Sequence, residues 1–353
     1  MIQAISPEFK NRGIVKNNLE SKFENNVRSK DIEEVWYGKY GVDERTKVIL
    51  SQPVTIVNKV GRHGLDYSVS PYQVDEQSYV RKYAQSINTL SFLKSLDFEK
   101  EIIVNENAAE LLEAKLRSRS WTASPILLSG NIDCYHPVER KLKITRSLLE
   151  LFLKYKHPVR VETKSALILR DMDLLAELAK HNLVSVAIAV NTLNNDLHKA
   201  MEPRISSPKK RMQIVKMLAS KSIPVTVSVP SIIPGLNDEG IFTLVKVAAE
   251  HGAKNIQAQV VGLNSEVTDL FKTWARKSFP YRWRKILRRV SSMHKNNFTT
   301  SEYGARMRSN GNYVDMIRQQ FTMAKKTYNM DVEIFEYNRS LYDGTPNPQM
   351  SLF

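Results

Sequence analysis

Short apolar runs alternate with amphipathic stretches from about residue 60 to residue 265. Six of the runs are rich in β-branched residues and predict strands. They lie at 66–70, 126–129, 159–163, 184–190, 225–229 and 256–261. Between them, apolar residues share one helical face, as Leu148, Leu149, Phe152 and Tyr155 do. Buried parallel strands connected by helices fit this rhythm, so the pattern predicts an α/β fold that closes wholly or partly into a barrel.

The two flanks of this alternating region differ from it. Residues 1–60 mix Asn, Lys and Glu with a few aromatic residues and show no sustained period, which predicts an extended, partly ordered N-terminal arm. Residues 61–265 carry the barrel. Residues 266–330 predict a basic helical extension, and residues 331–353 predict a C-terminal strand and tail.

Composition places the chain among folded proteins. Its 353 residues are 42% hydrophobic and 25% charged, which excludes disordered and collagen-like classes for most of the chain. No window approaches the roughly 18 consecutive apolar residues of a membrane span, and no signal peptide is visible, so we expect a cytoplasmic protein without a membrane partner. The single Cys134 excludes an internal disulfide and a cluster held by several protein thiolates. Oligomeric state has no signature in the sequence.

The net charge of +15 is concentrated near the C-terminal end. Residues 272–328 hold 14 Lys and Arg against two acids, Glu302 and Asp315, a local excess of +12. Such a field attracts polyanions and makes DNA a natural partner, whereas a solvated basic helix is the plain alternative.

Aromatic residues are interleaved with these cations. Trp274, Phe279, Tyr281 and Trp283 either stack on bases or form the apolar face of an amphipathic helix, and the sequence leaves both interpretations open. The residues that we expect to contact nucleic acid are Arg282, Trp283, Arg284, Lys285, Arg288 and Arg289.

Polar residues follow the predicted strands, where parallel α/β proteins collect their ligand chemistry. They include Asn131, Asp133, Lys164, Asn191, Glu202 and Arg204. A structural alternative exists for several: turn chemistry for Asn131 and Asp133, a surface cation for Lys164, and mutual pairing for Glu202 and Arg204. Phosphate-binding loops, dinucleotide fingerprints and nucleophile elbows are missing from the sequence, so these residues alone define no reaction.

Six short motifs occur in a fixed order along the chain. They are Gly-Leu-Asp-Tyr-Ser-Val-Ser-Pro-Tyr at 64–72, Leu-Asp-Phe-Glu at 96–99, Thr-Lys-Ser-Ala-Leu-Ile-Leu-Arg-Asp at 163–171, Met-Glu-Pro-Arg at 201–204, Ile-Pro-Gly-Leu-Asn-Asp at 233–238 and Gly-Ala-Arg-Met-Arg at 304–308. Together they resemble the radical S-adenosylmethionine (SAM) superfamily, and more narrowly its bacterial branch related to spore photoproduct lyase. The resemblance covers about residues 5–330. It implies a partial (β/α)6 TIM-like barrel, the radical SAM core fold.

The resemblance also implies where a ligand would lie. Together with their positions after successive strands, it places Asp75, Asn131, Lys164, Asn191 and Glu202 around one cavity at the C-terminal mouth of the barrel. Asp133 and Arg204 belong to the same expected SAM pocket.

The chain departs from that family at the cluster loop. The family carries a Cys-x3-Cys-x2-Cys motif whose thiolates hold a [4Fe-4S] cluster that chelates SAM, and the matching positions here are Asp75, Tyr79 and Lys82. A carboxylate, a phenol and an ammonium group do not replace three thiolate ligands of iron. The sequence therefore predicts a degenerate member that holds no cluster, performs no reductive cleavage of SAM and binds SAM weakly.

Three functions remain open at this stage. The first is a cluster-free descendant of a radical SAM enzyme that keeps the barrel and a DNA-binding role. The second is an active SAM-dependent enzyme with cluster-independent chemistry, such as group transfer. The third is a DNA-bound adaptor, because Gln349, Met350, Leu352 and Phe353 resemble the peptide by which bacterial DNA-processing proteins dock on the replication sliding clamp. A chance apolar terminus is the alternative to that peptide.

Overall fold

The computed structural model describes most of the chain from residue 101 onward and four strands before it. Its described ranges are 47–51, 57–62, 65–69, 72–73, 101–105, 107–119, 121–128, 133–203, 205–263, 265–293, 312–330 and 335–344.

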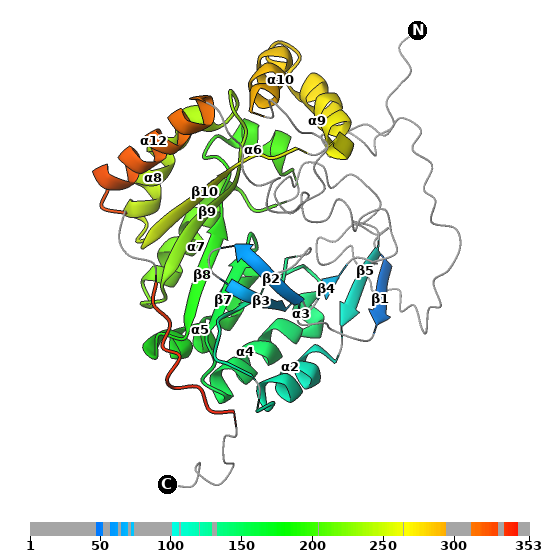
Figure 1. Cartoon of the computed structure of the whole chain (residues 1–353), viewed down its shortest axis with the longest axis vertical. Coiled ribbons are helices and arrows are strands. Elements are labelled where there is room, and N and C mark those ends of the chain that lie inside the picture. Colours follow the sequence, from blue (N-terminus) through cyan, green and yellow to red (C-terminus); the bar gives the residue numbers. More distant parts are fainter. Residues whose placement is uncertain are drawn as a thin grey trace.

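A seven-stranded sheet forms the centre of the molecule (Figure 1). Along the chain its strands are β2 (Val57–Arg62), β3 (Leu65–Val69), β6 (Ile126–Leu128), β7 (Val159–Thr163), β8 (Val184–Ala189), β9 (Val225–Ile232) and β10 (Asn255–Val260). The spatial order is β10-β9-β8-β7-β6-β3-β2, in which β2 is antiparallel to β3 and every other neighbouring pair is parallel. The parallel strands coincide with the six predicted ones, so the predicted α/β partial barrel is confirmed.

A second, three-stranded sheet lies beside the first. It contains β1 (Lys47–Ser51), β4 (Tyr72–Gln73) and β5 (Glu101–Asn105), in the order β1-β5-β4. Strand β1 and most of β2 fall inside the segment predicted as an extended arm. The apolar runs of these strands are short, three residues long in β1, and give no sustained period in the sequence. The strands were therefore not predicted.

Helices cover the outer face of the large sheet (Figure 1). The described helices in this part of the chain are α2 (Ala108–Leu116), α3 (Glu139–Leu142), α4 (Ile144–Lys154), α5 (Met172–Lys180), α6 (Asn195–Met201), α7 (Pro208–Ala219) and α8 (Ile241–Glu250), with short 3-10 turns η4 (Ala166–Asp171) and η5 (Asp238–Gly240). Helix α6 lies apart from the outer layer, beside α9 and α10. Sequence signals fix several starts. Asn194 caps α6 by accepting bonds from two backbone N–H groups, and Ser207 caps α7 ahead of Pro208. The predicted apolar face of α4 is buried at Leu148, Leu149 and Phe152.

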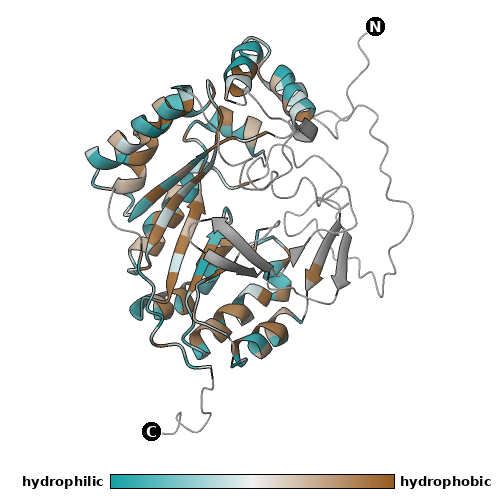
Figure 2. Ribbon diagram, in the orientation of Figure 1, coloured by the Kyte–Doolittle hydropathy of each residue, from teal (hydrophilic) through white to brown (hydrophobic). Residues whose placement is uncertain are grey.

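Apolar and polar residues alternate along strands of the large sheet, as the bands of different colour in Figure 2 show. Alternate residues such as Val159, Val161, Val225 and Val227 join the main core between sheet and helices. The intervening positions face the interior of the partial barrel and are polar in β7, β9 and β10. They include Arg160, Glu162, Thr226, Ser228 and Gln257. A lumen of this kind can hold a polar ligand, whereas an ordinary buried parallel sheet is apolar on both faces.

One contact shows how strongly the sheet curves. Arg160 on β7 donates from Nη2 to Oε1 of Gln257 on β10 at 3.0 Å, although β8 and β9 lie between them. Three strand spacings amount to about 14 Å along the sheet, which only a concave surface lets two side chains bridge comfortably. Ser228 Oγ also donates to Glu162 Oε1 at 3.4 Å across this interior.

The helical extension packs on the barrel mouth through a second core. Helices α9 (Ser265–Ser278), α10 (Trp283–Ser292) and α12 (Asn312–Thr327) confirm the predicted helical character. The second core joins them to the segments that follow strands β8, β9 and β10. Its members include Met201, Ile233, Leu263, Trp274, Ile286 and Val314. Among the described helices, none combines the length and apolar character required to cross a membrane.

The C-terminal segment 335–344 forms a strap across the amino end of the barrel. Asn338 N donates to Asn182 O at 3.0 Å, and Asp343 N donates to Tyr155 O at 3.1 Å. The hydroxyl of Tyr337 is bonded to Ser185 Oγ at 2.5 Å, while Tyr342 donates to Leu116 O. The described residues of the strap form no strand, and the backbone N–H groups of Asn338 and Asp343 bond to loops; the rest of the predicted C-terminal strand and tail lies outside the described residues.

Candidate functional site

Asp133 ties together the loops that follow β6 and β7. Its Oδ1 accepts bonds from Tyr135 N at 2.9 Å and Thr163 Oγ1 at 2.5 Å, and its Oδ2 accepts from Lys164 N at 2.8 Å. These bonds fix Lys164 at the carboxyl end of β7. Asp133 therefore acts as a positioning residue of the mouth, and its carboxylate is occupied by protein donors.

Lys164 and Glu202, two of the residues predicted to surround one cavity, form an ion pair in the structure. Lys164 Nζ lies 2.8 Å from Glu202 Oε1, with side chains 13% and 1% exposed. Arg211 of α7, which sequence reasoning missed, lies 2.6 Å from Glu202 Oε2 and is fully buried. Its other donors reach Ala189 O and Ser206 O. The carboxylate thus joins α6, α7 and the end of β7 in one buried ion cluster.

The electrostatics of this cluster favour an ionised glutamate. Burial alone would raise the pKa of Glu202, but the charges of Lys164 and Arg211 and the bonds from His198 and Lys164 outweigh it and hold that pKa well below its ordinary value. Glu202 is therefore a permanent anion at neutral pH and is unsuited to proton transfer there.

Asn191 follows β8 and faces the segment around β9. Its Oδ1 accepts from Ser231 N at 3.1 Å, and its backbone carbonyl accepts from Asn237 Nδ2 at 2.8 Å. Its Nδ2 and the Oγ of Ser231 are buried and have no hydrogen-bond partner in the described structure. Such orphaned groups are uncommon in folded proteins.

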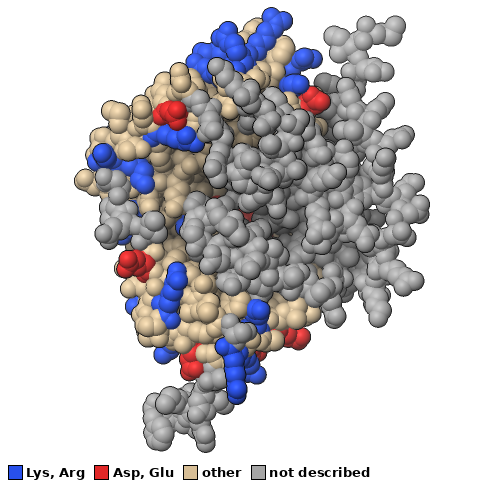
Figure 3. All heavy atoms as spheres, in the orientation of Figure 1, with Lys and Arg blue, Asp and Glu red and all other residues tan. Residues whose placement is uncertain are grey.

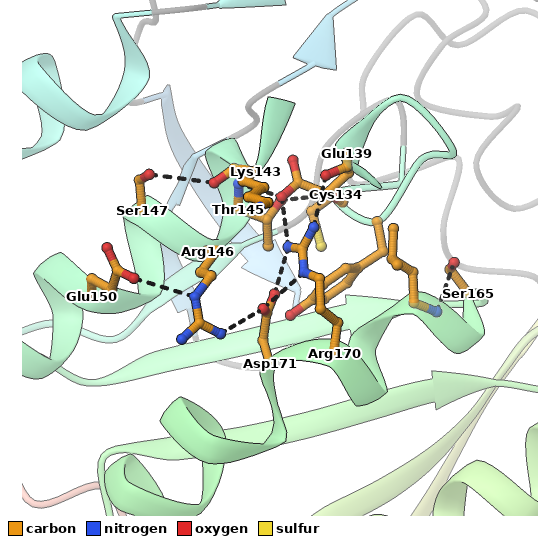
Figure 4. A network of polar contacts seen from close by, with 12 residues as sticks. Cys134, Glu139, Lys143, Thr145, Arg146, Ser147, Glu150, Ser165, Arg170 and Asp171 are labelled. Atoms are coloured by element: carbon orange, nitrogen blue, oxygen red, sulfur yellow. Dashed lines mark hydrogen bonds and ion pairs between the residues drawn. The ribbon is translucent and has the colours of Figure 1, made fainter. Parts of the chain in front are cut away.

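A buried ionic network joins the segments that follow β6 and β7 (Figure 4). Arg170 bonds to both oxygens of Asp171, at 2.9 and 2.7 Å, and to Glu139 Oε1 at 2.8 Å. Arg146 of α4 bonds to Asp171 Oδ1 at 3.0 Å, and Glu139 also accepts from Thr145 N. Asp171 directly precedes α5 but makes no side-chain capping bond to it, and its carboxylate accepts bonds from these two arginines.

Cys134 lies beside this network and is fully buried. Its Sγ is 3.8 Å from the carbonyl oxygen of Glu162. Burial, reinforced by the charges of Asp133 and Glu139, raises the pKa of the Cys134 thiol well above its usual range. The thiol is therefore a packed neutral group, unsuited to iron ligation or nucleophilic attack.

The remaining site predictions fall partly outside the described residues. Those outside are Asp75, Tyr79, Lys82, Asn131, Arg204, Gln349, Met350, Leu352 and Phe353. Within the described ranges, no group of three or more His, Cys, Asp or Glu side chains is placed to hold a metal ion. A [4Fe-4S] cluster does not fit this chain on donor chemistry alone, since three thiolates cannot come from one buried cysteine.

The predicted nucleic-acid residues divide into two groups. Arg284, Lys285 and Arg288 are exposed on α10. Arg282 and Arg289 instead hold the extension to the barrel. Arg282 Nη2 donates to Gly235 O at 3.0 Å, and Arg289 stacks 4.6 Å from the Tyr313 ring and pairs with Asp238 at 4.0 Å.

Gly235 is required where Arg289 packs. Its φ of +82° lies in the left-handed region, and a Cβ built there would lie 2.8 Å from Arg289 Nη1. The motif at 233–238 therefore docks α10 onto the mouth. Asp238 completes this junction by accepting from Tyr313 of α12; burial and this carboxylate raise the pKa of Tyr313 to about 12.

Part of the barrel matches a known family in sequence: residues 91–248 fit the sequence model of the Radical SAM superfamily. The match begins after Asp75, Tyr79 and Lys82, so it does not test the prediction that these residues replace the cluster thiolates. Spore photoproduct lyase shares the fold: one variant superposes with a TM-score of 0.54, and a complex with dinucleoside spore photoproduct with 0.52, both at 11% identity. These superpositions cover 89% and 86% of this chain and 88% and 85% of the lyase chains.

The relatives that are similar in sequence are uncharacterised proteins. One from Mycobacterium bovis is 26% identical over 205 residues, 57% of this chain and 60% of that protein. One from Methanocaldococcus jannaschii is 32% identical over 137 residues, 39% of this chain and 49% of that protein. The chain therefore spans about half to three fifths of the curated relatives it matches.

Proposed function

We propose that this protein is a radical SAM-type barrel that has lost its [4Fe-4S] cluster and acts as a non-radical, DNA-binding protein. The donor set carries the proposal: the sequence holds one cysteine, which is buried and neutral, and Asp, Tyr and Lys stand at the cluster positions. Reductive cleavage of SAM requires an electron from that cluster, so the reaction of the family has no source of electrons in this chain.

Most charged groups of the expected SAM pocket are already paired within the protein and are not available to bind SAM. Lys164 and Glu202 neutralise each other, and Asp133 is satisfied by the protein. Asn191 and Ser231 keep unpartnered groups. These groups favour weak binding of SAM or a similar polar ligand and are the basis of the second candidate, an enzyme with cluster-independent group transfer. Turnover of SAM without iron would favour that candidate.

Basic surface supports the DNA-binding part. Cations gather over α9 and α10 in Figure 3, and residues 272–293 contain eight Lys and Arg and no acid. The second core fixes these helices at the barrel mouth, so a bound polyanion would lie beside the polar lumen. Docking on the sliding clamp through Gln349, Met350, Leu352 and Phe353 stays a prediction from the sequence.

Anaerobic reconstitution with iron and sulfide tests the loss of the cluster. We expect a colourless protein without stoichiometric iron and sulfide, and no 5′-deoxyadenosine after addition of SAM and dithionite, because the chain lacks three thiolate ligands. An authentic radical SAM enzyme treated in parallel provides the positive control. A brown protein that forms 5′-deoxyadenosine would overturn the proposal.

Salt dependence tests the binding of DNA. Replacing Arg284, Lys285 and Arg288 with Glu should weaken binding and reduce the slope of log affinity against log salt by about 2 to 3, because each phosphate contact contributes about one unit. The matched control replaces Lys209, Lys216 and Lys221, which are exposed on or just after α7, with Glu. Fluorescence anisotropy over a salt series measures both. Equal slopes in the two triple variants would contradict this surface, and no binding by the wild type at low salt would refute the function.

A further inference from the structure

Turn 279–282 between α9 and α10 presents one free aromatic ring on the basic surface. Tyr281 is fully exposed, at 100%. The other aromatics that the sequence left ambiguous are engaged: Trp274 is buried and donates to Ala200 O, and Phe279 packs edge-on against Trp274 with ring centroids 5.3 Å apart. Trp283 lies under two guanidinium groups, those of Arg276 at 4.8 Å and Arg284 at 5.4 Å.

The backbone that carries Tyr281 is fixed on both sides. Arg282 N and Trp283 N both donate to Phe279 O, at 3.0 and 2.9 Å, and Pro280 restricts the preceding dihedral angle. The Phe279 ring anchors one side of the turn to the second core, and the Arg282 guanidinium anchors the other to Gly235 O. A ring on such a turn is preorganised, since contact with a ligand requires little further ordering of the chain.

Exposed cations lie close to Tyr281 in the chain on both sides, at the end of α9 and at the start of α10. Lys277 is exposed four residues before Tyr281, and Arg284 and Lys285 are exposed three and four residues after it. No acid occurs between residues 272 and 293. An exposed aromatic ring with cations around it suits a ligand that has both a planar face and a phosphate backbone.

We propose that Tyr281 stacks on an unpaired base of single-stranded DNA while Lys277, Arg284 and Lys285 neutralise the neighbouring phosphates. The proposal rests on the DNA-binding function above and specifies its substrate class. The bases of a duplex have both faces covered by stacked neighbours, whereas the bases of a single strand offer a free face. A stacking ring therefore favours single strands, and the preference is tolerant of sequence because every base has a π-face.

Fluorescence anisotropy with four labelled 20-nucleotide probes tests the proposal: single-stranded DNA, single-stranded RNA, blunt duplex DNA, and an abasic strand that keeps the phosphates. Tyr281→Ala should bind single-stranded DNA about 5- to 100-fold more weakly than the wild type, the range for loss of one base stack. Tyr281→Phe keeps the ring and should bind as the wild type does. Phe242→Ala, which removes another exposed ring (40%) on α8, is the matched control and should have no effect.

The abasic strand separates stacking from charge. We expect the wild type to bind it as weakly as Tyr281→Ala binds ordinary single strands, and we expect Tyr281→Ala to leave duplex affinity unchanged. Equal affinity of wild type and Tyr281→Ala for single-stranded DNA would overturn the stacking role while leaving DNA binding intact. Preference for the duplex that depends on Tyr281 would show intercalation and would also overturn it. Tighter binding of RNA than of DNA would reject DNA as the ligand, and no binding of any probe would refute the underlying function.

Discussion

Replacing Glu202 with Ala is expected to lower the free energy of unfolding by about 3–5 kcal/mol, which is the usual effect of removing one partner from a buried ion pair. Arg211 is fully buried and lies 2.6 Å from Glu202, so the variant would leave a guanidinium without its anion inside the protein. Urea unfolding at neutral pH, followed by circular dichroism, measures the change.

Two further comparisons test whether the loss of stability comes from the buried ion pair. Lys164→Ala should destabilise less than Glu202→Ala, because Lys164 is partly exposed and Arg211 would keep its partner. The pKa of Glu202 is depressed in the folded protein, so its stabilisation is present above the unfolded value near 4.5 and is lost as the pH falls toward the folded pKa. The stability difference between wild type and Glu202→Gln should therefore shrink as the pH falls below about 4.5. A wild-type stability for Glu202→Ala would contradict the buried cluster.

Trp274→Ala is expected to be similarly severe, with a loss of about 3–5 kcal/mol in the part of the protein that unfolds with the second core. The indole is fully buried among Phe271, Phe279 and neighbouring side chains, and its Nε1 donates to Ala200 O at 3.1 Å. Its removal leaves a cavity between α9 and the barrel mouth, so the helices that carry the basic surface should loosen.

Hydrogen exchange resolved by mass spectrometry measures this loosening. Protection should fall in α9 and α10 of Trp274→Ala and persist in β7 and β8, and DNA affinity should fall although no cation has been removed. Trp283→Ala is the matched control for the exchange measurement, because that ring is only partly buried and its loss should cost about 1 kcal/mol or less. Phe242→Ala, which removes an exposed ring on α8, is the control for DNA affinity. Uniform loss of protection across the barrel would contradict a separate second core.

The sequence predicted the parallel strands because their outward positions are apolar and β-branched, as Val159, Val161, Val225 and Val227 show. The sequence also contains a pattern from which the polar lumen could have been predicted. Polar residues alternate with these positions, as in Val159-Arg160-Val161-Glu162, and this period of two marks a polar lumen. Strands β1 and β2 were not predicted because the alternation of apolar and polar residues is weak in both. Their pairing depends on partners distant in the sequence, as in the β1–β5 pair.

The candidate site was predictable only in part. Placement after successive parallel strands was sufficient to bring Lys164 to Glu202, since those loops share one end of the barrel. The sequence left open whether Glu202 pairs with Arg204, which lies outside the described residues. It gave no sign of the described partner Arg211, because that residue lies on the next helix and its approach depends on how α6 and α7 pack. The division of aromatic rings into core and surface likewise required the packing of α9 against α6, which places Trp274 inside and leaves Tyr281 outside.

The strap at residues 335–344 packs against residues that are synthesised much earlier, so its contacts form late in folding. Tyr342 bonds to Leu116, 226 positions earlier, and its ring meets His157 edge-on at 5.2 Å. Closing so long a loop has a large entropic cost, which contacts made after closure must offset. During synthesis, the amino end of the barrel stays uncovered until the strap has emerged from the ribosome. Until then, the strap cannot cover Ser185, the partner of Tyr337, or the ring of His157. We therefore expect the nascent barrel to be more prone to aggregate at its amino end before the strap has packed.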